Sequence, residues 1–324
     1  MKRIYKKIFL LLVVCLSVSL CISPFTAFSA EPENRNDEIW ETVTYNYVTK
    51  SEKTESNSKN ALKANVQSSM QTMGLDEEFI SEAYTPDALE GTDAITPFDV
   101  HGNDDRIKVN PNNSPYCRIL ALLMGQDTNG DGKSDQWFVG TGFLEGPDVM
   151  ATAGHNFWNS INGWIEECRI YVRQNSATYG NSFYYPYEWT CATNYTEDDD
   201  SNYDWCVVTL QNNLGSANGW FGKAWSKNNI NGKNVTVSGY PGGSKQGYQY
   251  KDSGTTKIST TYQVYYDVDT EGGQSGSPVY DSNGIVWAIH TYGSDQYNCG
   301  NRITEFLYTI LQEKYLEGVE KWGL

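Results

Sequence analysis

The chain has 324 residues, of which 40 are acidic and 24 basic, so its formal net charge is −16. This charge argues against partners that are themselves negative, so we expect neither nucleic acid nor a membrane surface to bind it. The chain starts with basic residues, an apolar run over 8–20 and small residues near 27–30. This pattern predicts a secretory signal peptide over 1–30 and an extracellular protein, because the run falls short of the roughly 20 residues of a membrane-crossing helix.

Residues 31–98 are rich in acidic and small polar side chains and contain few aromatic ones. We predict that they form an acidic propeptide, with at most a weakly amphipathic stretch around 75–83. A disordered spacer that stays attached to the mature protein is the alternative. The functional domain is then expected at 99–324, with a net charge of about −11.

From residue 99 onward, short apolar runs alternate with Gly, Asn, Ser and Pro, which is typical of an antiparallel all-β protein. We predict strands at 118–125, 137–144, 148–153, 169–173, 206–210, 234–239, 262–268, 278–280 and 285–290. One C-terminal α-helix is predicted to follow Thr304, a candidate N-cap, because apolar residues then recur at three- and four-residue steps. Two barrels of similar size would fit this length.

Cysteine content predicts disulfides in an exported protein. Two cysteines leave with the signal peptide, and those that remain are Cys117, Cys168, Cys191, Cys206 and Cys299. They allow two disulfides and one free thiol, in pairings that the sequence does not decide. Cys168 and Cys191 flank a predicted hairpin, and we favour that pair.

Ser275 lies in a Gly-rich turn and is a candidate nucleophile. A serine hydroxyl is weak at neutral pH and needs a base within hydrogen-bond reach. The chain has three histidines. His101 lies in a polar segment that could not hold a base rigidly, and His290 follows the serine too closely. His155 ends a strand with small neighbours, which fixes the ring and leaves it room, so we predict His155 as the base.

The group that orients this base should be a buried carboxylate. Asp204 leads into the apolar strand 206–210, whereas Asp200 ends a charged loop and is the second choice. The order His155, Asp204, Ser275 is that of chymotrypsin-type proteases. The amides of Gly273 and Ser275 could form an oxyanion hole. A plain Gly-Ser turn is the alternative interpretation of this segment.

Several segments together resemble the bacterial glutamyl endopeptidases, secreted serine proteases that cleave after Glu and, less well, after Asp. The motifs are TAGH, NYDW, SGYPGG, DTEGGQSGSPV, AIHTYG and NRIT, in that order. The resemblance implies two antiparallel six-stranded β-barrels of the chymotrypsin type, over about 99–212 and 213–324, with a C-terminal helix. It makes His155 the general base, Asp204 its orienter and Ser275 the nucleophile, and it implies a monomeric zymogen, an activating protease and no cofactor for catalysis.

The same resemblance assigns an acid-binding pocket. Thr270 and a protonated His290 would bind the substrate carboxylate, together with the new α-amino group near Val100. Without the resemblance, His290 would be interpreted as a packed core residue. Glu271 lies beside this pocket, and its charge could weaken the preference for acidic residues. The rival predictions are therefore a protease with another specificity and a catalytically silent, protease-like binding module.

One departure from the family concerns a disulfide. Family members often carry a cysteine directly after the catalytic histidine, bonded to one on the preceding strand. Here these places hold Asn156 and a residue near Thr141. Both cysteines are absent together, so we expect other cross-links to replace this one.

The polar loop 127–135 has the spacing of a calcium-binding loop. Oxygen ligands would come from Asp127, Asn129, Asp131, the Lys133 carbonyl and Asp135. The twelfth position is Phe138 instead of the bidentate Glu of such loops. The sequence therefore leaves two interpretations, a structural calcium site and a polar hairpin turn.

Overall fold

The computed structural model describes residues 38–73, 83, 104–293 and 297–324, which belong to one compact unit. Predictions for the signal peptide, for His101 and for Val100 lie outside these residues, as does the stretch 75–83 apart from Ala83. Within the described part, no helix is long and apolar enough to cross a membrane.

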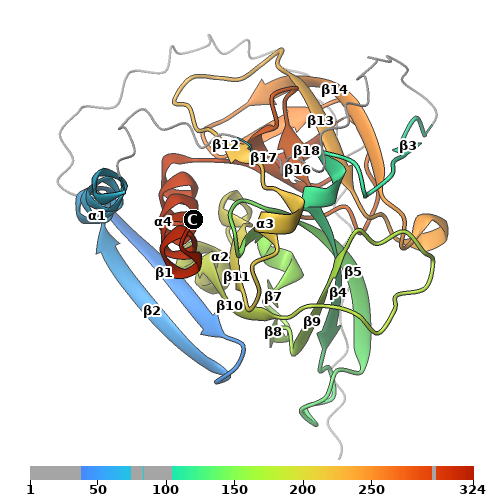
Figure 1. Ribbon diagram of the computed structural model, residues 1–324, viewed down its shortest axis with the longest axis horizontal. Helices are drawn as coiled ribbons and strands as arrows, with labels where there is room; N and C mark the ends of the chain where they lie inside the picture. Colours follow the sequence, from blue (N-terminus) through green and yellow to red (C-terminus); the bar gives the residue numbers. More distant parts are fainter. Residues whose placement is uncertain (1–37, 74–82, 84–103, 294–296) are drawn as a thin grey trace, which may run out of the picture. The chain divides into compact units, whose positions relative to one another are not determined.

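Among the described residues, eight strands form a first, open sheet. Their spatial order is β2 (Ser51–Ser58), β1 (Ile39–Asn46), β10 (Pro186–Ala192), β11 (Cys206–Leu210), β6 (Val149–Thr152), β5 (Gln136–Leu144), β4 (Ile119–Gln126) and β9 (Glu167–Val172) (Figure 1). Strand β4 is apolar along most of its length because both of its faces are buried. Ile119 and Ala121 pack into one core, whereas Leu120 and Leu122 pack into another.

Six further strands close into a barrel within the described residues. Their order is β17 (Ile285–Tyr292), β16 (Pro278–Tyr280), β13 (Asn234–Gly239), β14 (Tyr250–Ser259), β15 (Gln263–Tyr266) and β18 (Asn298–Arg302). The β17–β18 ladder completes the ring, with Ile289 opposite Asn301. Short strands β12 (Gly222–Lys223) and β3 (Ile107–Lys108) pair with β17 and β14, respectively. The core of this barrel contains Val237, Val264 and Val279.

The prediction of two closed barrels is therefore confirmed for one barrel. The other six strands, from β10 to β9, belong to the open sheet, and the outer edge of β10 pairs with β1 instead of closing the ring. Thr42 of β1 lies opposite Ala192, and Asn46 lies opposite Glu188. At the opposite edge of the sheet, Ile170 of β9 forms an isolated bridge with Tyr184, which lies just before β10 in the chain.

The predicted C-terminal helix is α4 (Glu305–Trp322). Its N-cap is Thr304, whose side chain accepts a hydrogen bond from the Leu307 amide at 3.3 Å, and Gly323 ends it in the left-handed conformation. The shorter elements are β7 (Trp158–Asn159), β8 (Gly163–Trp164), α2 (Thr193–Asp198), α3 (Gly215–Asn218) and the 3₁₀ turns η2 (Tyr116–Arg118), η3 (Gly154–Asn156), η4 (Ser201–Tyr203) and η5 (Gly243–Lys245).

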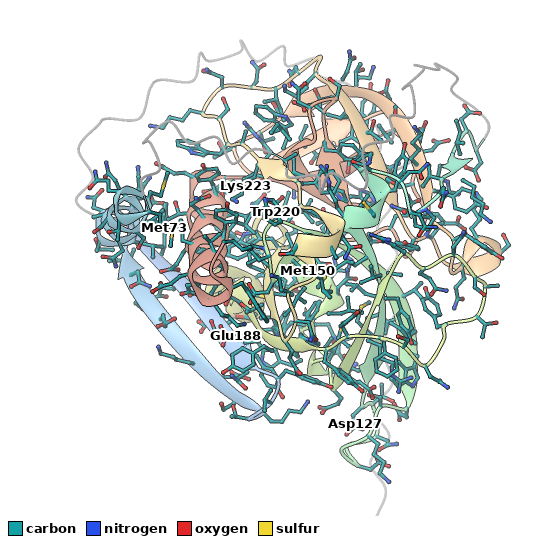
Figure 2. The ribbon with its side chains drawn as sticks, in the orientation of Figure 1. Met73, Asp127, Met150, Glu188, Trp220 and Lys223 are labelled. Carbon is teal, nitrogen blue, oxygen red and sulfur yellow. The ribbon has the colours of Figure 1, made fainter. Side chains whose placement is uncertain are left out.

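The acidic segment is folded where it is described. Strands β1 and β2 form a long hairpin, followed by α1 (Lys59–Thr72), which packs on α4 (Figure 1). Trp40 stacks on Phe306 with ring centroids 4.8 Å apart, and Lys63 pairs with Glu305 at 2.5 Å. Between α1 and α4 lies a cavity of about 840 Å³, lined by residues such as Met73 and Trp220, labelled in Figure 2, and by none of the predicted site residues.

The predicted disulfides are not formed. In the described residues, the thiols of Cys117, Cys168, Cys191, Cys206 and Cys299 are all free and buried. The favoured pair was wrong because the register of β10 and β11 places Cys191 opposite Cys206 and not opposite Cys168 on β9.

Candidate active site

His155 follows strand β6 of the open sheet. The strand ends at Thr152, and the next residues wind into the 3₁₀ turn η3, which fixes the backbone of His155. A Cβ atom on Gly154 would lie 3.0 Å from Asp204 Oδ1, so the glycine lets this carboxylate approach closely. The His155 side chain keeps 28% of its surface exposed, which leaves one side of the ring available to a substrate.

Asp204 is fully buried and contacts His155 through both of its carboxylate oxygens. Its Oδ1 accepts from the His155 amide at 2.7 Å, and its Oδ2 lies 2.7 Å from His155 Nδ1. This geometry orients the ring and directs Nε2 away from the carboxylate. Asp200, the second choice from the sequence, instead caps the turn η4 by accepting from the Asn202 amide at 3.0 Å.

The charges of the two groups stabilise each other. Burial opposes ionisation of Asp204, but the charge and hydrogen bonds of His155, with the Tyr292 hydroxyl, outweigh it and lower the pKa of Asp204. Burial likewise opposes protonation of His155, but Asp204 outweighs it and raises the pKa of His155. The Tyr292 ring lies 5.5 Å from the His155 ring. Sequence reasoning missed Tyr292, because an aromatic residue at the end of a strand carries no specific signal.

Ser275 lies in the loop between β15 and β16 of the barrel. Gly273 and Gly276 have φ angles of +97° and +90°, which favour glycine. A Cβ atom on Gly276 would lie 2.0 Å from the Thr141 carbonyl oxygen, so no larger residue fits there. Among the described residues, no acceptor bonds the amides of Gly273 and Ser275. Two unpaired amides near a hydroxyl are what an oxyanion hole requires.

The direction of the Gly273 amide follows from its neighbour. The Gly272 carbonyl oxygen accepts from the Gly242 amide at 2.7 Å. In a trans peptide the carbonyl and the following N–H point in opposite directions. The N–H of Gly273 therefore points away from Gly242.

The serine hydroxyl itself is not yet engaged with the base. Ser275 Oγ lies 3.5 Å from the Thr291 carbonyl oxygen, at the limit of a hydrogen bond, and within the described residues it makes none to His155. In unliganded proteases this bond is often long or poorly aligned. The structure brings His155 and Asp204 together directly, and it brings Ser275 to them through neighbouring residues.

Those neighbours occupy the places of the family disulfide. Asn156 Nδ2 donates to the Ser275 carbonyl oxygen and to Thr152 Oγ1, both at 2.9 Å. Thr141 donates its amide to the same Ser275 oxygen and its hydroxyl to the Gly273 oxygen, both at 3.0 Å. The expectation that other disulfides replace this cross-link was wrong. Hydrogen bonds between the open sheet and the nucleophile loop stand in its place.

Replacing Asn156 by alanine should lower kcat about tenfold and leave KM nearly unchanged, because it frees the nucleophile loop on one side. Steady-state kinetics on a peptide substrate measures both. Asn159→Ala is the matched control, since the Asn159 side chain accepts from the amides of its own turn and donates to Gln126 Oε1 at 3.2 Å, but makes no bond to the Ser275 loop in the described chain. Equal losses of kcat in the two variants would contradict a specific role for Asn156.

His290 lies on β17 and is 3% exposed. Its Nδ1 is 2.7 Å from the Tyr266 hydroxyl and 3.1 Å from the Cys299 carbonyl oxygen. Burial lowers the pKa of His290 to about 4, so the ring is neutral at pH 7 in the free protein. Thr270 is half-buried just before the nucleophile loop. The predicted protonated His290 belongs to the complex with a substrate carboxylate, and it stays a prediction.

The predicted calcium ligands lie in the loop between β4 and β5, where Figure 2 labels Asp127 on a hairpin tip that protrudes at the bottom of the view. Asp127 accepts from the amides of Gly132 at 2.6 Å and Gly130 at 2.7 Å, and Asp135 accepts from the Thr128 amide at 3.0 Å. In the part of the chain that the structure describes, no group of three or more His, Cys, Asp or Glu could hold a metal ion. The carboxylates of Asp127 and Asp135 bond amides of their own loop, as the hairpin-turn interpretation expects.

The chain is similar in sequence to known proteases. The family model of the trypsin-like peptidase domain matches residues 140–289. A glutamyl endopeptidase of Bacillus licheniformis is 33% identical over 230 residues, which are 65% of this chain and 67% of that protein. An extracellular metalloprotease of Bacillus subtilis is 29% identical over 224 residues, 67% of this chain and 70% of that protein.

The chain is also similar to solved structures of proteases. A Glu endopeptidase in complex with MPD aligns with a TM-score of 0.57 and 27% identity, and covers 66% of this chain and 98% of its own. A protease from Arthrobacter nicotinovorans aligns with a TM-score of 0.53 at 14% identity, over 65% of this chain and 99% of its own, which shows a shared fold alone.

Proposed function

Because this chain belongs to the glutamyl endopeptidase family, we propose that it is a secreted serine endopeptidase that cleaves after Glu and, less well, after Asp. The chain is a serine protease of the chymotrypsin fold, and its substrates are peptides or proteins. The observation that best supports the proposed chemistry is the buried Asp204 with its two 2.7 Å contacts to His155.

In the proposed reaction, the Ser275 hydroxyl attacks the carbonyl carbon of the scissile bond while Nε2 of His155 takes its proton. Asp204 stabilises the imidazolium that forms. The amides of Gly273 and Ser275 receive the oxyanion. His155 then gives the proton to the leaving amine, and water hydrolyses the acyl-enzyme with the same base. No cofactor takes part in these steps.

Acid recognition is proposed at His290 and Thr270. The free enzyme holds His290 uncharged, because burial lowers the pKa of His290 to about 4. A substrate carboxylate beside the ring would favour the protonated form. Binding of a Glu side chain should therefore take up a proton, which a Gln side chain would not require.

This linkage predicts how specificity changes with pH. The ratio of kcat/KM for a Glu peptide to that for a matched Gln peptide should fall as pH rises from about 6 to about 9, by up to tenfold per pH unit. Both substrates share the titration of His155, so it cancels in the ratio. A ratio that stays flat or rises with pH would contradict proton uptake at His290. Faster cleavage of matched Ala or Phe peptides would support the rival specificity.

We propose that the protein is made as a zymogen. In this proposal residues 1–30 are a signal peptide, 31–98 a propeptide, and 99–324 the protease, with its halves meeting near residue 212. An activating protease would cut near residue 99, and the mature enzyme would act as a monomer. N-terminal sequencing of the active form tests the cut, and activity before and after processing tests the zymogen.

The start of the mature chain supports this proposal. The Asp105 amide donates to Asp269 Oδ2 at 3.2 Å, and Ile107 pairs with Lys251. These contacts hold the chain just downstream of Val100 beside the loop that carries Thr270. In this proposal the new amino group near Val100 would compensate a substrate carboxylate.

One observation favours a catalytically silent module, namely the missing hydrogen bond between Ser275 and His155 among the described residues. Labelling the processed protein with a serine-directed phosphonate separates the two functions. The protease should form an adduct on Ser275, and it should do so equally in EDTA. No adduct would favour the binding module.

A further inference from the structure

Arg106 holds the loop that precedes the nucleophile. Its side chain is only 6% exposed, and it donates to Gln274 Oε1 at 2.9 Å and to Glu271 Oε2 at 2.8 Å. Both acceptors lie within four residues of Ser275. Asp104 fixes the guanidinium from the other side through two hydrogen bonds, at 2.8 and 2.9 Å. A planar guanidinium that makes several charge-assisted bonds is a rigid connector.

The bonds of Gln274 show what Arg106 holds in place. The Gln274 side chain is fully buried, and its Oε1 also accepts from the Glu271 amide at 3.0 Å. The Gln274 amide in turn donates to the Glu271 carbonyl oxygen at 3.0 Å. These bonds close the turn that contains Gly273 and leads into Ser275. Arg106 anchors this turn at both of its ends, and the turn presents the two unpaired amides.

Glu271 explains why a cation is needed here. Its side chain is 42% exposed and carries a carboxylate one residue after Thr270, beside the proposed acid pocket. Alone, this charge would repel an acidic substrate side chain. Arg106 pairs with it directly, and Lys245 Nζ lies 3.9 Å from it. Lys245 also contacts Asp104, which draws its charge toward that residue. The pair with Arg106, at 2.8 Å, is the closer of the two contacts to Glu271.

We propose that Arg106 is a positioning residue for the oxyanion turn and a determinant of acid specificity. It fixes the amides of Gly273 and Ser275, and it neutralises Glu271 so that a carboxylate can enter the pocket. This inference rests on the proposed endopeptidase function and deepens it. Because Arg106 lies just downstream of the proposed processing site, the same contacts connect the start of the mature chain to the catalytic loop.

Four variants separate the positioning role from the specificity role. Each is assayed as processed enzyme on matched Glu and Gln peptides. Rates are divided by the concentration of active sites, which is measured by titration with a phosphonate. Arg106→Met should lower kcat about tenfold on both peptides and lower the Glu-to-Gln ratio of kcat/KM about tenfold. Arg106→Lys keeps the positive charge but lacks the planar guanidinium with its several donors. It should therefore lower kcat and keep the Glu-to-Gln ratio of kcat/KM. Glu271→Gln alone should change the ratio less than about twofold. Adding it to Arg106→Met should restore the ratio and not kcat.

Arg169→Met is the matched control, because it also removes a guanidinium paired with a carboxylate, Glu167 at 2.6 Å, and should change neither quantity. Wild-type kcat and ratio in Arg106→Met would overturn the proposal. A ratio that Glu271→Gln does not restore would overturn the charge role. If Arg106→Met does not fold, the kcat loss of Arg106→Lys decides the positioning role. A wild-type enzyme without Glu preference would refute the proposed function, while kcat on the Gln peptide would still test positioning.

Discussion

Replacing Ser275 by alanine should lower kcat by roughly 10⁵- to 10⁶-fold and leave the fold intact. The variant loses the atom that attacks the substrate, so His155 and Asp204 have nothing to activate. What remains is the residual catalysis of substrate binding and of the oxyanion amides. The stability should change by less than about 0.5 kcal/mol, because the only bond of Ser275 Oγ in the described chain is the 3.5 Å contact to Thr291.

Stopped assays on a peptide substrate, with a melting curve of the same sample, measure both quantities. Ser253→Ala is a suitable control, since the Ser253 hydroxyl bonds Thr236 Oγ1 at 2.8 Å across the β13–β14 ladder and, among the described residues, makes no bond to Ser275 or His155. It should retain wild-type kcat. Turnover within tenfold of wild type in Ser275→Ala would refute serine catalysis by this chain.

Apolar runs predicted nine of the strands between residues 99 and 324. The run at 118–125 is β4, and the run at 285–290 is the start of β17. Three of the longer strands in this region were missed. β14 is polar and only partly buried on both faces, β18 has Cys299 as its one apolar residue, and β10 begins with a proline. Such strands form because neighbouring strands need partners, which the local sequence does not reveal.

The folded part of the acidic segment was missed for a different reason. Its net charge suggested disorder, yet Leu62, Val66 and Met70 recur every four residues after the N-cap Ser58. These three apolar side chains form the buried face of α1. The periodic signal was present, but the average composition of the segment concealed it.

The candidate site shows the same division between local and distant signals. His155, Asp204 and Ser275 could be chosen from the sequence because each chemical role restricts the residue type and its local setting. Arg106 could not, because it reaches Gln274 from 168 residues away. Asn156 was noticed only as a missing cysteine, and its bond to the Ser275 oxygen depends on how the sheet and the barrel meet.

Replacing Asp204 by asparagine should lower kcat about 10⁴-fold, and the cause is the position of one proton. The His155 amide can only donate, and it lies 2.7 Å from Asp204 Oδ1, so the amide oxygen of the variant must face it. The amide nitrogen then faces His155 Nδ1, which must accept. The ring proton therefore moves to Nε2, and Nε2 can no longer take the proton of Ser275.

The pH profile distinguishes this cause from a loss of structure. Asp204 raises the pKa of His155 in the wild type, so activity is lost as pH falls through a value above the ordinary one. In Asp204→Asn this charge is gone while burial still opposes protonation, so the acid limb of the remaining activity should move to lower pH. Asp200→Asn, which alters a helix cap, should keep both kcat and the acid limb. An acid limb that stays in place in Asp204→Asn would show that this carboxylate does not set the protonation of His155.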